Sequence, residues 1–209
     1  ATLEEIEQAL GVCCLALEGI QPKSAQHCVD AFVPDRIREQ VTLMHCTTEY
    51  PCPFGQVNLR TMDTLRERTG LAVGYSDHTQ GIAISLAAVA RGARLIEKHF
   101  TLDRSLPGPD HAASLNPAEL HELVAGIRAV SQGLGSSTKS PSAVEMRNAG
   151  VARKSIVAAT PICRGERFDS HNLTTKRPGN GLPPVRYWSL LGQEADRDYA
   201  ADEPIRDEQ

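Results

Sequence analysis

Apolar and polar positions alternate between two periodicities from residue 41 to residue 133. Three apolar runs have the length of buried strands, at residues 41–46, 71–75 and 93–100. A segment with helical spacing of its apolar residues follows each run, at residues 58–69, 81–91 and 117–133. Three strand-then-helix units in succession predict parallel strands, and we therefore expect an α/β fold here.

The segment before these units has a different pattern of apolar residues. Thr2 and Glu5 have the spacing of a capping box, and Leu3, Ile6 and Leu10 continue as an apolar stripe, which predicts an N-terminal helix. Residues 19–39 show weak periodicity and predict an irregular segment with a short helix near residues 34–40.

The C-terminal third predicts a separate small module. Residues 133–142 are rich in Gly, Ser, Thr and Pro, as in a linker. Short β-rich runs follow at residues 155–159 and 173–176, with a short helix expected near residues 184–191. We divide the chain into an α/β domain at 1–133, a linker at 134–146 and a β-rich domain at 147–209.

Charge and apolar content narrow the possible partners. The formal net charge is −4 with both signs interspersed, which disfavours binding to nucleic acid or to an anionic membrane surface. Apolar stretches are too short to span a membrane, and the N-terminus lacks the pattern of a secretion signal, so we expect a cytoplasmic protein. Six cysteines occur without a CxxC pair, and we expect reduced thiols.

Polar residues at the ends of the second and third predicted strands point to a metal site. Residues two apart in a strand share a face, so Ser76 lies beside His78, and Glu97 beside His99. Parallel strand ends meet at one edge of a sheet, where two imidazoles and substrate or water oxygens hold a divalent cation. Glu97 would orient a bound water. The alternative is that each histidine merely bonds to a loop.

Three further residues are candidates for binding or proton transfer. Asp110 follows a rigid Pro-Gly-Pro segment and suits a sugar hydroxyl or a proton transfer with His111 beside it, or else it caps the next turn. Tyr50 offers a ring and a hydroxyl, or else anchors its loop. Arg177 stands on a glycine-rich turn, where it binds a ligand oxygen or is simply solvated. From these residues alone we infer a metal-assisted α/β enzyme of undefined reaction.

Five motifs in order resemble those of the N-acetylneuraminate (sialic acid) synthase family: HCTTEYP at 45–51, GYSDHT at 74–79, IEKHFT at 96–101, GPDH at 108–111 and KRPG at 176–179. The resemblance runs from residue 1 to about residue 205. It implies the last three βα units of a (β/α)8 TIM barrel followed by an antifreeze-like (SAF) domain. It also implies a domain-swapped homodimer, in which the SAF domain faces the partner's barrel.

The resemblance further implies a reaction. Family enzymes condense phosphoenolpyruvate with N-acetylmannosamine, or its phosphate, to a nine-carbon sialic acid and inorganic phosphate, using Mn²⁺ or Mg²⁺. The implied roles are metal ligands for His78 and His99, phosphoenolpyruvate contacts for Ser76 and Thr48, amino-sugar contacts for Tyr50 and Asp110, and an N-acyl contact for Arg177 of the other subunit. Catalytic roles fall to Asp110, Tyr50 and Glu97.

Two departures from the family pattern qualify this expectation. Thr48 stands where some members have asparagine. The first five βα units are absent, together with the glutamate and lysines expected to grip phosphoenolpyruvate, so we expect the 209-residue chain alone to be inactive. Two alternatives remain open: a legionaminic or other nonulosonic acid synthase, and a non-catalytic protein that uses its SAF domain for binding or dimerisation.

Overall fold

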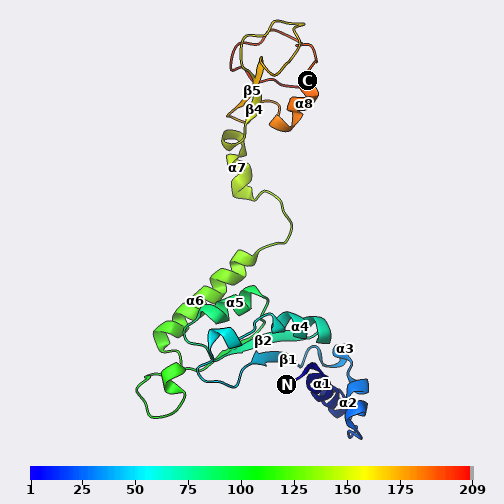
Figure 1. Cartoon of the computed structure of the whole chain (residues 1–209), viewed down its shortest axis with the longest axis vertical. Helices are drawn as coiled ribbons and strands as arrows, with labels where there is room; N and C mark the ends of the chain where they lie inside the picture. Colours follow the sequence, from blue (N-terminus) through cyan, green and yellow to red (C-terminus); the bar gives the residue numbers. More distant parts are fainter. Residues whose placement is uncertain (208–209) are drawn as a thin grey trace. The chain divides into compact units, whose positions relative to one another are not determined.

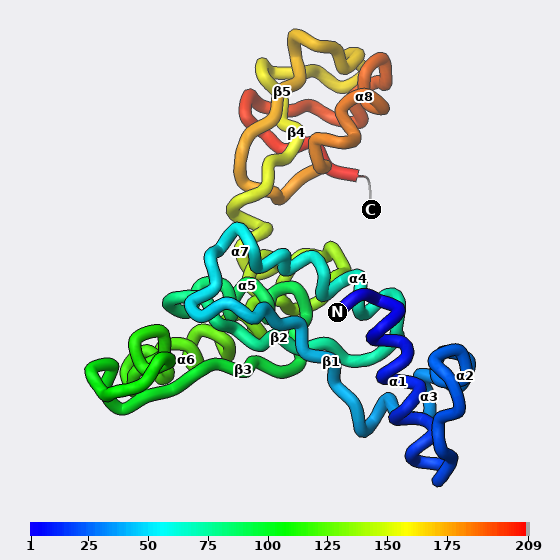
Figure 2. Tube along the Cα trace, turned by 60° about the horizontal axis from the view of Figure 1, so that its bottom comes forward, coloured from blue at the N-terminus to red at the C-terminus, as the bar shows by residue number. Residues whose placement is uncertain are grey.

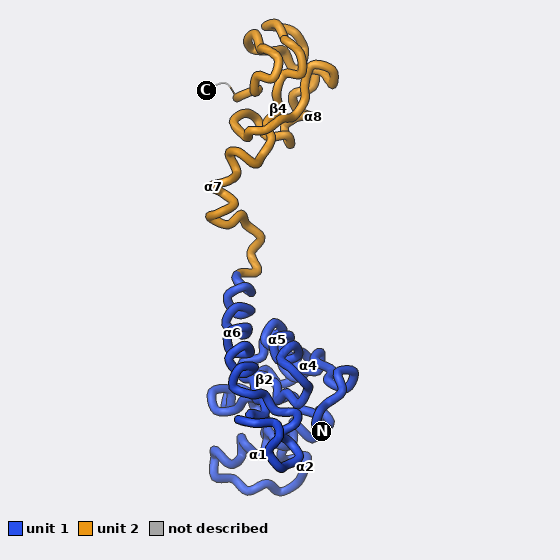
Figure 3. Tube along the Cα trace, turned by 90° about the vertical axis from the view of Figure 1, so that its left-hand side faces the viewer, with its two compact units in different colours: residues 1–135 blue, residues 136–209 orange. Residues whose placement is uncertain are grey.

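A computed structural model describes residues 1–207 of the chain. The chain separates into two compact units, residues 1–135 and residues 136 onward (Figure 3). Each unit has its own hydrophobic core, and each is described by itself.

Unit 1 is an α/β unit built around a three-stranded parallel sheet in the order β1-β2-β3 (Figures 1 and 2). This confirms the predicted fold class for this part. Its elements are α1 (Leu3–Leu17), α2 (Ala25–Ala31), α3 (Pro34–Ile37), β1 (Thr42–Cys46), the 3-10 turn η1 (Phe54–Gln56), α4 (Thr61–Thr69), β2 (Ala72–Asp77), α5 (Ala83–Ala90), β3 (Ile96–Lys98), η2 (His111–Ala113) and α6 (Pro117–Leu134).

One face of the sheet is packed under helices. Val73 and Tyr75 project from β2 into a core that includes Met62 and Leu65 of α4 and Ala88 of α5. All five side chains are buried, which holds the middle strand rigidly. Because side chains alternate along a strand, Ser76 and His78 emerge on the face away from these helices.

Strand lengths differ from those predicted in a way that matters for the site. β2 continues to Asp77 instead of ending at residue 75, because Ser76 and Asp77 pair in register with Glu97 and Lys98. β3 covers only Ile96–Lys98 of the predicted 93–100, because Phe100 pairs with Leu115 instead. The sheet therefore ends one residue before each histidine.

The N-terminal segment is more regular than predicted. The capping box is confirmed, with Glu5 N donating to Thr2 Oγ1 and Thr2 N donating to the Glu5 carboxylate. Helix α2 lies within residues 19–39, which were predicted to be irregular, and the Ser24 side chain caps it by accepting from His27 N. α1 and α2 approach closely at Gly11, where a Cβ atom would lie 1.7 Å from the Cys28 carbonyl oxygen.

Unit 2 comprises a helix and a small β-rich body. Its elements are α7 (Ala143–Ala152), β4 (Ser155–Ala158), β5 (Leu173–Lys176), η3 (Pro184–Arg186) and α8 (Tyr187–Leu190). β4 and β5 are antiparallel and bury Ile156 and Leu173 in a common core. α7 begins inside the segment predicted as a linker, because Ser142 and Glu145 form a capping box there.

The structure also bears on the expected absence of membrane spans and of disulfide bonds. Within residues 1–207, none of the helices combines the length and the apolar character needed to cross a membrane. All six cysteines are free thiols in the structure.

Candidate active site

The polar ends of the three strands lie side by side in register. Cys46 of β1 pairs with Ser76 of β2, which in turn pairs with Glu97 of β3. The Ser76 hydroxyl donates a 2.6 Å hydrogen bond to Oε1 of Glu97. Ser76 and Glu97 therefore lie on the same face of the sheet, on neighbouring strands, as predicted.

His78 and His99 meet just beyond these strand ends. Their ring centroids are 5.1 Å apart, with the rings nearly perpendicular. The Tyr50 ring stands edge-on to His78 at 4.0 Å and tilted to His99 at 5.5 Å. Residues that follow three different strands thus form one aromatic group.

The environment of His78 favours the neutral form of its imidazole. Burial lowers the pKa of His78 below its usual value, and the neighbouring His99 lowers it further, against an opposing effect of Asp77. Nδ1 of His78 lies 3.7 Å from Sγ of Cys46. A neutral imidazole carries the lone pair that a metal ion or a proton needs.

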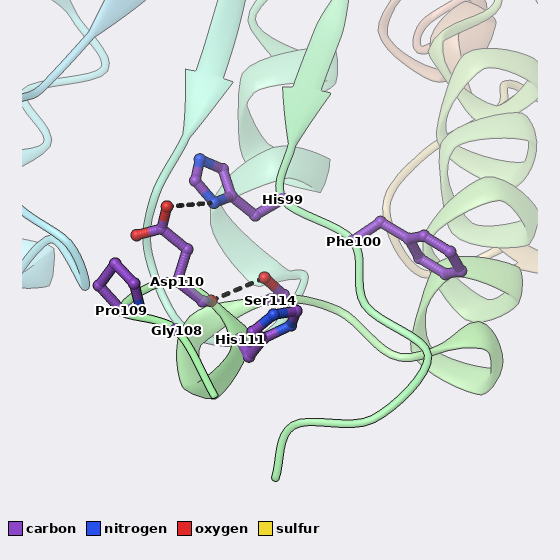
Figure 4. Close-up of a pocket in the computed structure, with 7 residues that line it drawn as sticks. All are labelled: His99, Phe100, Gly108, Pro109, Asp110, His111 and Ser114. Carbon is purple, nitrogen blue, oxygen red and sulfur yellow. Dashed lines mark hydrogen bonds and ion pairs between the residues drawn. The ribbon is translucent and has the colours of Figure 1, made fainter. Parts of the chain in front are cut away.

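A cavity of about 270 Å³ opens beside His99 (Figure 4). Its lining residues are His99, Phe100, Gly108, Pro109, Asp110, His111 and Ser114. The Asp110 carboxylate points at His99, with Oδ2 3.7 Å from Nδ1, as the dashed line in Figure 4 marks. Among residues 1–207, no backbone amide bonds to this carboxylate as a helix cap, so the alternative of a capping role for Asp110 is not seen.

Hydrogen bonds hold the loop that carries Asp110. The Ser114 hydroxyl donates to the Asp110 carbonyl oxygen at 2.7 Å. Thr101 Oγ1 lies 2.8 Å from Nδ1 of His111. Arg104 donates from Nε to the Ser114 carbonyl oxygen at 2.9 Å. The loop is therefore fixed on both sides of Asp110, as a binding residue requires.

The donor set fits a divalent cation held by two protein ligands. Within the described part of the chain, no group of three or more His, Cys, Asp and Glu side chains is arranged to hold a metal ion. Two imidazoles at 5.1 Å leave the remaining positions to substrate or water oxygens. Imidazole nitrogens together with substrate or water oxygens suit a divalent cation.

Two candidate residues are not joined to this group. Thr48 lies exposed in the loop after β1. Arg177 belongs to unit 2, where its Nε donates to the carbonyl oxygen of Ala152 at the end of α7 at 2.7 Å. This bond uses one of five guanidinium donors and leaves the fork at its tip for a ligand.

Sequence reasoning missed three residues that touch the site. Cys46 contacts His78, while Asp77 and Lys98 form a buried ion pair behind the histidines, with Nζ and Oδ2 3.0 Å apart. Side-chain alternation along a strand could have identified Asp77 and Lys98. Each precedes a candidate ligand by one position and so projects to the opposite face of the sheet.

Comparisons with known proteins identify relatives that match most of this chain. N,N'-diacetyllegionaminic acid synthase of Campylobacter jejuni is 48% identical over 99% of this chain and 57% of its own length. Human N-acetylneuraminate-9-phosphate synthase is 40% identical over 79% of this chain and 46% of its own length. The chain thus spans about half the length of these curated relatives.

A solved structure supports the fold. The spore coat polysaccharide biosynthesis protein E of Chromobacterium violaceum superposes with a TM-score of 0.61 at 27% identity, covering 87% of this chain and 55% of that one. The SAF domain model matches residues 153–209, and the NeuB family model matches residues 1–139. With two thirds of its length matched and the motif histidines paired at the strand ends, the chain belongs to the NeuB family and carries a C-terminal SAF domain.

Proposed function

We propose that this chain is the C-terminal part of a nonulosonic acid synthase that condenses phosphoenolpyruvate with an acylated amino sugar. The observation that carries the proposal is the His78–His99 pair, 5.1 Å apart at the strand ends of a NeuB-family chain. A pair of imidazole nitrogen donors beside a cavity lined by the Asp110 carboxylate suits activation of a sugar aldehyde.

We propose a diacetamido sugar as the acceptor. The relative from Campylobacter jejuni, named for N,N'-diacetyllegionaminic acid, is 48% identical, whereas the human N-acetylneuraminate-9-phosphate synthase is 40% identical. The similarity therefore favours the legionaminic alternative over N-acetylmannosamine, which the motifs first suggested. A product with two N-acetyl groups implies a six-carbon acceptor that already carries two acetamido groups.

We infer that unit 1 is the last part of a (β/α)8 barrel. The proposed boundaries remain residues 1–133 for the barrel portion, 134–146 for the linker and 147–209 for the SAF domain. Supporting the partial barrel, β1 and β3 have strand neighbours on one side only among the described residues. Closed barrels have no such edges, so further strands are needed to complete the sheet, and the chain alone is expected to lack activity.

The proposed chemistry joins two carbons and releases phosphate. C3 of phosphoenolpyruvate attacks the aldehyde carbon of the open-chain sugar, water adds at C2, and the C2–O bond to phosphate breaks. A divalent cation, Mn²⁺ or Mg²⁺, supplies Lewis-acid polarisation of the aldehyde when bound by His78 and His99.

The chain's own side chains have distinct tasks in this scheme. Glu97 takes a proton from the adding water on the carboxylate oxygen that Ser76 does not engage. The Ser76 hydroxyl and the more remote Thr48 contact phosphoenolpyruvate. Asp110 accepts a hydrogen bond from a sugar hydroxyl, while the Tyr50 ring packs on the sugar.

Arg177 would complete the sugar site from a second subunit. Its guanidinium is held at Nε by Ala152, which leaves donors for the carbonyl oxygen of an N-acyl group. This role requires the domain-swapped homodimer that the family resemblance implies. The partners of the chain in this proposal are phosphoenolpyruvate, the amino sugar, the cation and a second copy.

Kinetic assays with each candidate sugar in turn test the proposed acceptor. The full-length protein containing this chain is supplied with Mn²⁺, phosphoenolpyruvate and either the diacetamido sugar, N-acetylmannosamine or N-acetylmannosamine 6-phosphate, and phosphate release is measured. We expect the largest kcat/KM with the diacetamido sugar. A larger kcat/KM with either form of N-acetylmannosamine would restore the sialic acid assignment and reject the legionaminic one.

A further inference from the structure

Asp77 and Lys98 form an ion pair deep inside unit 1. Nζ of Lys98 lies 3.0 Å from Oδ2 of Asp77, and the side chains are 4% and 0% exposed. Removing two charges from water costs several kcal/mol per ion, so a buried pair is weak evidence for a stabilising role. Its place in the fold points to a different role.

Every oxygen of the Asp77 carboxylate is engaged. Oδ1 accepts from the amide and the hydroxyl of Thr79, both at 2.8 Å. Oδ2 accepts from the Ser85 hydroxyl of α5 at 2.5 Å and faces Lys98. Lys98 Nζ also donates to the Thr79 carbonyl oxygen at 2.7 Å. The residues on both sides of His78 are therefore tied into one buried network, whose members are Asp77, Thr79, Ser85 and Lys98.

The network lies where the strands stop pairing. Asp77 and Lys98 are the last residue pair in the register of β2 and β3. Beyond it the backbones diverge: the His78 carbonyl accepts from Cys52 N at 2.8 Å, and the His99 carbonyl accepts from Leu115 N at 2.9 Å. The sheet ladder therefore does not set the spacing between the two imidazoles.

Two side-chain links connect the ends of β2 and β3, one on each face of the sheet, in addition to the contacts of the Tyr50 ring with both histidines. On the open face, Ser76 donates to Glu97. On the helix-covered face, Asp77 bonds to Lys98, one position closer to the histidines. A charged link between two buried side chains is stiffer than a single part-buried hydrogen bond, because it has no solvent partner to exchange with.

We propose that Asp77 and Lys98 are positioning residues that fix the separation and orientation of His78 and His99. The proposal rests on the metal-binding role given to these histidines under the proposed function. Asp77 acts from within the His78 turn and Lys98 from the residue before His99, so the ion pair connects the two ligands through their own backbones.

The test replaces both charges at once. Lys98→Met alone would leave Asp77 charged and unpaired in the core, which is expected to unfold the protein. The double variant Asp77→Asn, Lys98→Met removes both charges, a change that cores often tolerate. It is made in the full-length protein beside a control double variant, Glu7→Gln, Arg68→Met, which removes an ion pair located before the start of β2.

Two measurements separate the positioning role of Asp77 and Lys98 from the metal-binding role of the histidines. The first is the set of ¹⁵N histidine ring resonances in the metal-free protein, where we expect those of His78 and His99 to move and that of His121 on α6 to stay. The second is Mn²⁺ affinity by the free-ion electron paramagnetic resonance signal, which we expect to weaken about tenfold in the double variant, as for other residues behind metal ligands, and not in the control.

The outcomes are distinct. Unmoved ring resonances in a folded double variant would overturn the positioning role, whatever the metal does. Shifted resonances with no Mn²⁺ binding even in the parent protein would support positioning and reject the proposed metal site. If the double variant does not fold, Ser85→Ala removes one bond of the network, and an unmoved His78 resonance in this folded variant would overturn the proposal.

Discussion

Sγ of Cys46 lies 3.7 Å from Nδ1 of His78, on the same face of the sheet as Ser76 and Glu97. This contact engages one nitrogen of the imidazole and leaves Nε2 for a ligand. The nitrogen that a histidine presents to a metal is commonly selected in this way by the partner of the other nitrogen.

The Cys46 contact leads to a prediction for metal affinity. Cys46→Val removes the partner of Nδ1 while keeping an apolar side chain, so the imidazole can change tautomer and rotate. We expect Mn²⁺ affinity to fall about tenfold, and Cys46→Ser, which keeps a hydroxyl partner, to lose less. Isothermal titration of the full-length protein measures both, and equal affinities for the two variants would show that the thiol has no such role.

Asp110 should act on the sugar and not on phosphoenolpyruvate. Asp110→Asn keeps the shape of the cavity but removes the charge that faces His99. We expect KM for the amino sugar to rise about tenfold, since a hydrogen bond to a charged group contributes 1.5–3 kcal/mol, and KM for phosphoenolpyruvate to stay the same. Asp103→Asn is the matched control, because among residues 1–207 that carboxylate of the same loop bonds only to Ser105. A change in both KM values would argue against a sugar-specific role.

A pair of glycines inside helices should respond in opposite ways to alanine. In α1, a Cβ at Gly11 would overlap the Cys28 carbonyl, so Gly11→Ala should lower the free energy of unfolding by about 2 kcal/mol. In α7, a Cβ at Gly150 meets no described atom within 4 Å, and Gly150→Ala should stabilise the helix by about 1 kcal/mol. Urea denaturation compares the two, and similar shifts would contradict the close α1–α2 packing.

Alkaline pH should weaken unit 2 through Tyr199. Burial and a 2.5 Å hydrogen bond from its hydroxyl to Asp196 raise the pKa of Tyr199 to about 12. The unfolded chain loses this proton near pH 10, so stability is complete below pH 10 and falls by about 2 kcal/mol as pH rises to 12. Denaturation followed by Trp188, the single tryptophan of the sequence, measures the loss. Tyr199→Phe should flatten this part of the profile, and an unchanged slope would exclude Tyr199 as its source.

The part of the site that depends on strand periodicity could be predicted from the sequence. Ser76 beside His78 and Glu97 beside His99 follow from alternation along a strand, and the parallel register then brings the two pairs together. The approach of Asp110 to His99 could not be derived in this way. It depends on a loop conformation set by hydrogen bonds across an irregular segment, such as Arg104 to the Ser114 carbonyl, and such a segment has no periodicity to predict it from.

Two helices were missed for local reasons. Each begins at a serine whose side chain accepts from a backbone amide three residues on: Ser24 for α2 and Ser142 for α7. Neither helix has a broad apolar stripe, and in α7 no residue is buried within the described part of unit 2. Periodicity is a signal of burial, so helices with little buried surface are invisible to it.

The central claim is that His78 and His99 together form the metal site of a nonulosonic acid synthase. The most direct measurement is Mn²⁺-dependent phosphate release by the full-length protein, compared among the parent, His78→Ala, His99→Ala and the surface control His121→Ala. We predict that each site variant loses activity about a hundredfold while the control keeps it. Undiminished phosphate release in either site variant would contradict the claim, and no release by the parent with any acylated amino sugar would identify a binding protein instead of an enzyme.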